Sequence, residues 1–258
     1  MIGHVEADRY DERDLRIVEL VASQAANAIY RFLEEQREHD QHLAAIEALS
    51  AAVDARDPFT HTHSRRVADL AFIVASELGL PEREAREIEL AGLLHDIGKI
   101  GIPDRILTKP GRLDTEERLI MMSHADMGAR IVGRSGALSH LTPIVRHHHE
   151  WFDGRGYPDG LRGDQIPLGA SILAVVDALE TMTSNRVYRR ALPLDEARGE
   201  IERGRGSQFP PRVADAVLRL LDHDERFIQI LAHGPAATSG STRLAPIRSS
   251  DVVALRVL

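Results

Sequence analysis

A histidine and an aspartate stand side by side at the end of an apolar stretch, in the segment Leu93-Leu94-His95-Asp96-Ile97-Gly98-Lys99. The residues before them are nearly all apolar, so we expect a buried helix that carries these polar groups into the interior. Buried ionisable side chains are costly unless they are paired or bind a metal. The segment therefore predicts a metal site, with a histidine paired within the core as the alternative for this segment taken alone.

Further histidines and one aspartate fall where helical periodicity predicts inward-facing side chains. Neighbouring side chains of a helix diverge by about 100°, so His148 and His149 share one ion only where their helix frays, or else they serve different ions. We expect His147, which precedes them, to be exposed. Several such positions in one chain favour a common partner, a metal, over separate pairings in the core. The additional candidate ligands are His63, His124, His148, His149 and Asp177.

The chain contains no cysteine, so nitrogen and oxygen donors must hold any metal, and these suit iron, manganese or zinc. Two ions about 3.5–4 Å apart can clamp a phosphodiester while a bridging water, as hydroxide, attacks phosphorus. The second oxygen of Asp96 is free to bridge two such ions. One predicted ligand set is His63, His95, Asp96 and Asp177, and the other is His124, His148 and His149.

Three basic positions near these ligands have two interpretations. Lys99 lies one turn from His95 and either holds a phosphate oxygen or complements the dipole at a helix end. Arg186 and Arg189, which follow Asp177, either contact phosphate or form a solvated basic end together with Arg190.

Composition limits other functions: the net charge of −8 argues against general nucleic-acid binding. No apolar run suits a membrane span and no secretory signal is recognisable, so we expect a cytoplasmic protein.

The periodicity predicts an all-α fold with a Gly- and Pro-rich loop over 151–165 and a flexible tail over 233–258. Residues 11–56 form either one long helix or two consecutive ones. This segment is either a surface helix of one domain or a connector that pairs with a second copy. Other helices are expected over 63–78, 81–96, 114–131, 138–149, 194–203 and 211–221, and an apolar helix that holds residues 172–177 is expected after Pro167. Residues 103–113 are expected to form a loop.

Taken together, these motifs resemble the HD-GYP family, a branch of the HD-domain metal-dependent phosphohydrolases. The resemblance covers about residues 48–221 and rests on His95-Asp96-Ile97-Gly98-Lys99-Ile100-Gly101-Ile102-Pro103 followed by His148-His149-Glu150 and Asp153-Gly154-Arg155-Gly156-Tyr157-Pro158. It implies a cytoplasmic phosphodiesterase that hydrolyses cyclic di-GMP to pGpG or GMP at a centre of iron or manganese, with nickel, cobalt or zinc as alternatives.

The resemblance also implies roles for individual residues. The seven candidate ligands would hold the metals, while Lys99, Arg186 and Arg189 would contact phosphate. The loop Gly156-Tyr157-Pro158 would lie near the substrate entrance and could bind a protein partner. Family members with three metals use a glutamate where this chain has Phe59, so we expect two metals unless His61 contributes. Glu180 stands where aspartate is common, one turn after Asp177.

The first residues resemble the last helix of a GAF sensor domain. We therefore expect a GAF-like remnant and connector over 1–47, a catalytic domain over 48–232 and a tail over 233–258. Two other functions stay open: a non-hydrolysing sensor or scaffold with the same pocket, or a phosphohydrolase for another nucleotide. A homodimer through the N-terminal helix is a further expectation.

Overall fold

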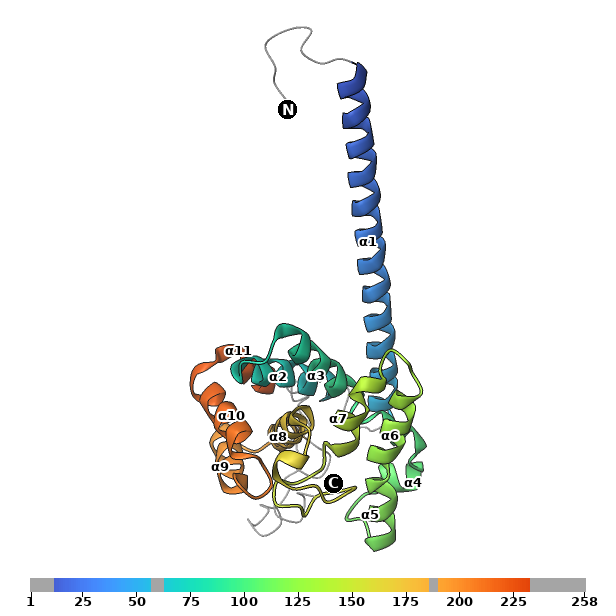
Figure 1. Ribbon diagram of the computed structural model, residues 1–258. Helices are drawn as coiled ribbons and strands as arrows, with labels where there is room; N and C mark the ends of the chain where they lie inside the picture. Colours follow the sequence, from blue (N-terminus) through green and yellow to red (C-terminus); the bar gives the residue numbers. More distant parts are fainter. Residues whose placement is uncertain (1–11, 57–62, 186–189, 233–258) are drawn as a thin grey trace, which may run out of the picture. The chain divides into compact units, whose positions relative to one another are not determined.

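The computed structural model describes residues 12–56, 63–185 and 190–232, and the regular structure within them is entirely helical (Figure 1). Isolated bridges, Asp153 with Arg162 and Arg205 with Phe209, are the strand-like pairings in these residues. The predicted all-α class is confirmed. The helices are α1 (Glu12–Asp54), α2 (His63–Glu77), α3 (Glu82–Leu94), α4 (Asp104–Leu107), α5 (Thr115–Met122), α6 (His124–Gly133), α7 (Thr142–His147), α8 (Leu168–Thr183), α9 (Leu194–Gly204), α10 (Pro211–His223) and α11 (Glu225–Ala232), with 3₁₀ turns at Ile97–Gly101, Ser139–Leu141 and Gly163–Gln165.

Contacts divide the chain into two units, Met1–Ile46 and Glu47–Leu258. The described part of the first unit is one continuous stretch of α1, so a single helix replaces the two alternatives left by the sequence. Its large apolar side chains are exposed, among them Val18 and Phe32. The division into 1–47, 48–232 and 233–258 stays a prediction, and the first eleven residues and the tail lie outside the described residues.

In the second unit, α8 lies among the other helices and contacts α2, α3, α7, α9, α10 and α11 (Figure 1). Its Ile172, Leu173 and Leu179 side chains are fully buried, as expected for a helix that is apolar on most of its faces. Helices α2 and α3 pack so closely that a Cβ atom on Gly92 would lie 2.8 Å from the Cα of Ala68. This close crossing fixes the two helices whose ends carry His63 and His95.

Several predicted boundaries are wrong. The helix expected over 114–131 is divided at Ser123 into α5 and α6, although the predicted N-cap Asp114 does form a capping box with Glu117. The division lies beside Gly98, where a Cβ atom would come 1.9 Å from the carbonyl oxygen of His124, so tertiary packing sets this bend. The expected loop over 103–113 contains α4, the helix expected over 138–149 begins as a 3₁₀ turn, and α11 was not predicted.

None of the described helices combines the length and the apolar character needed to cross a membrane.

Candidate metal centre

Four of the candidate histidines stand at helix ends. His63 begins α2, His95 follows α3, His124 begins α6 and His148 follows α7. The side chains of all four are almost completely buried. The position of His124 corrects the sequence analysis, which placed it in the middle of a helix. Helix ends leave backbone carbonyl groups without partners inside the helix, and three of the four rings bind such a group.

Three of these rings are held in the same way. The Nδ1 atoms of His95, His124 and His148 lie 2.6, 2.7 and 2.7 Å from backbone oxygens three residues earlier in the chain. A carbonyl oxygen only accepts, so Nδ1 carries the proton and Nε2 presents a lone pair to the interior. A histidine that ligates a metal commonly donates its other N–H to a carbonyl in this manner.

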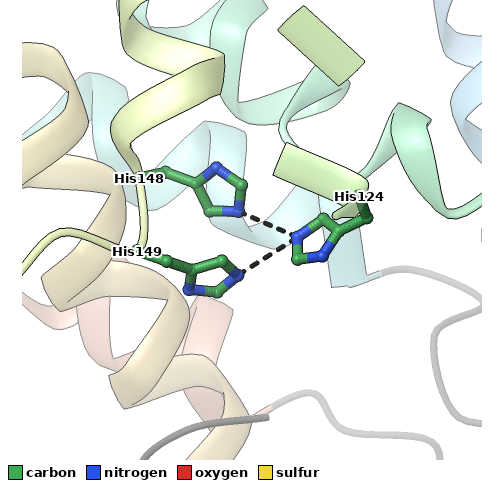
Figure 2. Close-up of side chains that lie close together, drawn as sticks. All are labelled: His124, His148 and His149. Atoms are coloured by element: carbon green, nitrogen blue, oxygen red, sulfur yellow. Dashed lines mark hydrogen bonds between the residues drawn. The ribbon is translucent and has the colours of Figure 1, made fainter. Parts of the chain in front are cut away.

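The Nε2 atoms of these three rings therefore carry no proton. The Nε2 atom of His124 lies 3.4 Å from that of His148 and 3.2 Å from that of His149, and the dashed lines in Figure 2 join these atoms. The lone pairs of His124 and His148 cannot bond to each other, whereas a cation between them would be bound by both. Within the described residues, buried His95 Nε2 has no hydrogen-bond partner. These nitrogens fit a metal.

Asp96 lies between the two predicted ligand sets. Its Oδ2 is 3.4 Å from Nε2 of His95 and 3.9 Å from Nε2 of His63, whereas its Oδ1 is 3.4 Å from Nε2 of His124. Asp177 Oδ1 completes the first set at 3.2 Å from His63 Nε2. One carboxylate therefore faces both sets with different oxygens, as a bridging ligand would. Donor atoms lie within 4.8 Å of one another in the groups His63, His95, Asp177; His95, Asp96, His148; and His124, His148, His149.

Glu180 supports His63 from the other side and was not among the candidate site residues. Its Oε2 is 2.5 Å from Nδ1 of His63, and its Oε1 accepts from Arg66 Nε at 2.7 Å and from Ser184 Oγ at 2.7 Å. The side chain is about 1% exposed. The signal in the sequence was its place one turn after Asp177 on an apolar helix, which puts both carboxylates on one face.

The two sets differ in electrostatics. Although burial lowers the pKa of His63, the carboxylates of Glu180 and Asp177 together outweigh it and raise the pKa to about 10. Burial and the neighbouring His95 and His124 lower the pKa of His148 to about 3. Burial opposes ionisation of Asp96, but the charges of Lys99 and the histidines hold its pKa well below the usual range. The first set is anionic and the second consists of neutral imidazoles.

Lys99 lies beside the centre, with its Nζ atom 2.7 Å from Asp96 Oδ2. It occupies the 3₁₀ turn Ile97–Gly101, and its partly exposed side chain contacts the bridging candidate directly. Both interpretations of this residue from the sequence remain predictions. The candidate phosphate contacts Arg186 and Arg189, together with Phe59 and His61, lie outside the described residues.

The predicted loop over 151–165 wraps back onto the centre. Buried Glu150 accepts hydrogen bonds from three successive backbone amides, those of Asp159 at 2.7 Å, Gly160 at 3.0 Å and Leu161 at 3.1 Å. The Tyr157 ring stacks on His149 with centroids 4.8 Å apart and is only 7% exposed. The Tyr157–Pro158 peptide bond is cis. Tyr157 therefore forms part of the wall around the centre.

The backbone of this loop also approaches the histidine segment closely. A Cβ atom on Gly156 would lie 2.2 Å from the amide nitrogen of Trp151, so this position requires glycine. The expected exposure of His147 is wrong. Its side chain is 13% exposed, and its Nε2 atom lies 2.9 Å from Oδ2 of Asp159.

The model of the HD-domain family matches residues 47–213. The chain belongs to this family. The resemblance noted in the sequence is confirmed at this level, whereas the GAF-like remnant stays a prediction. The match includes all seven candidate ligands of this HD domain.

Curated relatives agree with the assignment. A cyclic di-GMP phosphodiesterase of Thermotoga maritima is 45% identical over 177 residues, covering 68% of this chain and 48% of that protein. A 3'3'-cGAMP-specific phosphodiesterase 2 of Vibrio cholerae is 39% identical, covering 72% of this chain and 36% of that protein. The chain thus spans about half the length, or less, of the curated relatives it matches.

A solved structure shares the fold. The cyclic GMP-AMP-specific phosphodiesterase V-cGAP3 of V. cholerae superposes with a TM-score of 0.56 at 20% identity, covering 75% of this chain and 50% of that one. This likeness supports the helical architecture of the HD domain.

Proposed function

We propose that this HD domain is a metal-dependent phosphodiesterase that hydrolyses cyclic di-GMP to pGpG, GMP or both. The observation that carries the proposal is Asp96, whose two oxygens face two separate groups of imidazole nitrogens. A two-metal centre with a shared carboxylate is suited to phosphodiester hydrolysis.

Seven side chains would hold the two ions. Iron or manganese is proposed from the family resemblance, and nickel, cobalt and zinc suit the same nitrogen and oxygen donors. Such ions, when bound, neutralise phosphate charge and make water a stronger nucleophile near neutral pH. The proposed ligands are His63, His95, Asp96, His124, His148, His149 and Asp177.

The remaining roles belong to the protein alone. The three backbone carbonyls orient His95, His124 and His148 so that lone pairs face the centre, and Glu180 orients His63, whose proton would be lost on metal binding. Lys99 would bind a phosphate oxygen after its ammonium turns from Asp96, with which it pairs at 2.7 Å. Arg186 and Arg189 are proposed as further phosphate contacts. Tyr157, stacked on His149, would keep that ring in place and limit the entry of water.

Cyclic di-GMP is favoured because the Thermotoga relative, 45% identical, bears that activity in its name. The Vibrio relative acts on 3'3'-cGAMP, so a hybrid cyclic dinucleotide is the second candidate substrate. A sensor or scaffold without turnover is less well supported, because the described part of the site retains a complete set of metal-binding side chains.

The test combines metal content and turnover on one sample of the full chain purified without oxygen. Elemental analysis should find about two equivalents of iron or manganese, and chromatography should show linear product from cyclic di-GMP. Metal without turnover of any cyclic dinucleotide would overturn the enzymatic proposal and favour the sensor.

We also propose that the helical segment 12–46 pairs with a second copy of the chain. The segment exposes large apolar side chains, which is unfavourable for a helix that stays in water. Those of Leu15, Val18, Ile29 and Phe32 are between 53% and 60% exposed. Light scattering after size-exclusion chromatography should give a dimer at micromolar concentration, and a monomer would contradict the pairing.

A further inference from the structure

Helix α5 and the residues before it form a concave site that none of the proposed metal ligands lines. A cavity of about 360 Å³ opens along α5 and the residues that precede it. This volume is within the range of about 300–1,000 Å³ that small-molecule sites occupy. The lining residues are Leu113, Asp114, Thr115, Arg118, Leu119 and Met122.

Part of the cavity wall consists of apolar side chains that remain accessible to solvent. Helix α5 has no buried residue, and Leu119 is 62% exposed, so its apolar side chains border open space. The carboxylate of Asp114 is engaged in capping α5, because its Oδ1 atom accepts a hydrogen bond from the amide of Glu117 at 2.9 Å. The apolar surface of Leu113, Leu119 and Met122 is therefore available to the flat face of a ring.

One cation stands among these apolar groups. Arg118 is half-buried, and its guanidinium forms no hydrogen bond or ion pair with any residue that the structure describes. Arg205, by contrast, donates from Nε to Oδ1 of Asp215 at 2.6 Å. A planar guanidinium at this cavity offers two parallel N–H donors to a ligand edge that only accepts.

The cavity adjoins the centre. Helix α5 ends at Met122, and the proposed ligand His124 begins the next helix after a single intervening residue. Met122 itself lines the cavity, so this wall of the cavity is two residues away from a proposed ligand. A ligand that placed one phosphate on the metals could therefore extend its base toward α5.

We propose that this cavity binds a guanine base of the substrate and that Arg118 recognises the base through its O6 and N7 atoms. The inference rests on the proposed function, because it assigns the base of a nucleotide whose phosphate is at the metal centre. Guanine presents two acceptors on one edge, which match the guanidinium, whereas adenine presents a donor at the same place. The apolar walls suit the faces of a purine better than they suit a phosphate group.

The test is titration calorimetry of the metal-loaded full chain with GMP and with AMP. The unmodified chain should bind GMP about tenfold more tightly than AMP. Arg118→Met should weaken GMP binding by about tenfold and leave AMP binding unchanged, so that the preference disappears. Arg130→Met, which removes the same charge from an exposed position of α6, should behave like the unmodified chain.

The outcomes separate this inference from the proposed function. An unchanged preference in Arg118→Met would overturn the guanine site. An equal loss for both nucleotides would overturn it as well, because it would mean that Arg118 contacts phosphate. Hydrolysis of cyclic di-GMP by the unmodified chain is measured in parallel, and its failure would count against the phosphodiesterase without altering the base preference. Thermal melting of each variant shows whether it is folded.

Discussion

The two predicted ligand sets form two halves of the candidate centre, and they differ in how the ring of His63 is held. The carboxylate half is His63, His95, Asp96 and Asp177, and the histidine half is His124, His148 and His149. In the histidine half, His124 and His148 bind carbonyl oxygens three residues earlier in the chain. In the carboxylate half, His95 is held in the same way by the carbonyl oxygen of Gly92, but His63 binds Glu180, which is 117 residues away in the sequence. The reason lies in helix direction. His95, His124 and His148 follow the C-terminal ends of α3, α5 and α7 within two residues, where free carbonyl oxygens lie behind the ring, whereas no helix ends directly before His63 within the described residues, and its acceptor is on α8.

This difference predicts unequal metal binding. The carboxylate half offers the charges of Asp177 and Asp96, with Glu180 behind His63, whereas the histidine half offers neutral rings and one oxygen of Asp96. A divalent ion gains more from the anionic set, and a carboxylate bound to an imidazole makes that ring a stronger ligand. We therefore expect the carboxylate half to load first and release its ion last.

Asp96→Asn removes the one group that the halves share and should have the largest effect. An amide offers a single neutral oxygen, so it cannot bridge two ions. Activity should fall by more than about 100-fold, beyond the range for residues that act behind the ligands, and metal content should fall with it. Elemental analysis and the hydrolysis assay are run on the same sample. Full activity with retained metal would exclude Asp96 as the bridge.

Lys99→Ala distinguishes substrate binding from support of Asp96. If the ammonium group binds a phosphate oxygen, the variant keeps both metals and loses about 100-fold in kcat/KM. Lys99 also pairs with Asp96, and the metal content of the variant shows directly whether loss of that pair disturbs the centre. Arg130→Ala, at an exposed position, is the charge-matched control. An unchanged rate would leave Lys99 with a role at the helix end alone.

Glu180→Gln should affect one half and spare the other. Glutamine can still accept from His63 but lacks the charge, and its amide nitrogen cannot accept from Arg66. The affinity of the carboxylate half for its ion should fall by about 10- to 100-fold, the range for groups that support a ligand. Dialysis against graded chelator, followed by elemental analysis, measures each ion. Equal weakening of both ions would show that the halves are not independent, and Glu202→Gln, far less buried, serves as control.

The same contrast explains what the sequence could predict. The histidine half could be proposed from local patterns, because His148 and His149 are adjacent and the following glycines indicated a helix end. Asp177 and Asp96 could be proposed because carboxylates within apolar runs are conspicuous. Glu180 was noticed but given no role, since its use depends on how α8 packs against α2, and pairings between distant helices leave no periodic signal.

The helix boundaries show the same limit. Helical periodicity predicted one helix across Ser123, because the apolar positions of α5 and α6 share a continuous spacing. The bend there follows from Gly98, whose backbone approaches His124 too closely for any side chain, and that approach belongs to tertiary structure. The all-α class needed only helical periodicity and the absence of alternating segments, so it was predictable.

Glu150→Gln should have the smallest effect and should concern the histidine half. Glu150 follows His149 directly and anchors three amides of the loop that carries Tyr157. Glutamine can accept with one oxygen only, so part of this charge-assisted bonding is lost, and the free energy of unfolding should fall by about 1–3 kcal/mol. Urea denaturation measures this change. Because Tyr157 stacks on His149, the variant should also release the ion of the histidine half at lower chelator concentration, while the ion of the carboxylate half is retained. Loss of stability with unchanged release of both ions would mean that the loop merely covers the centre and does not position His149.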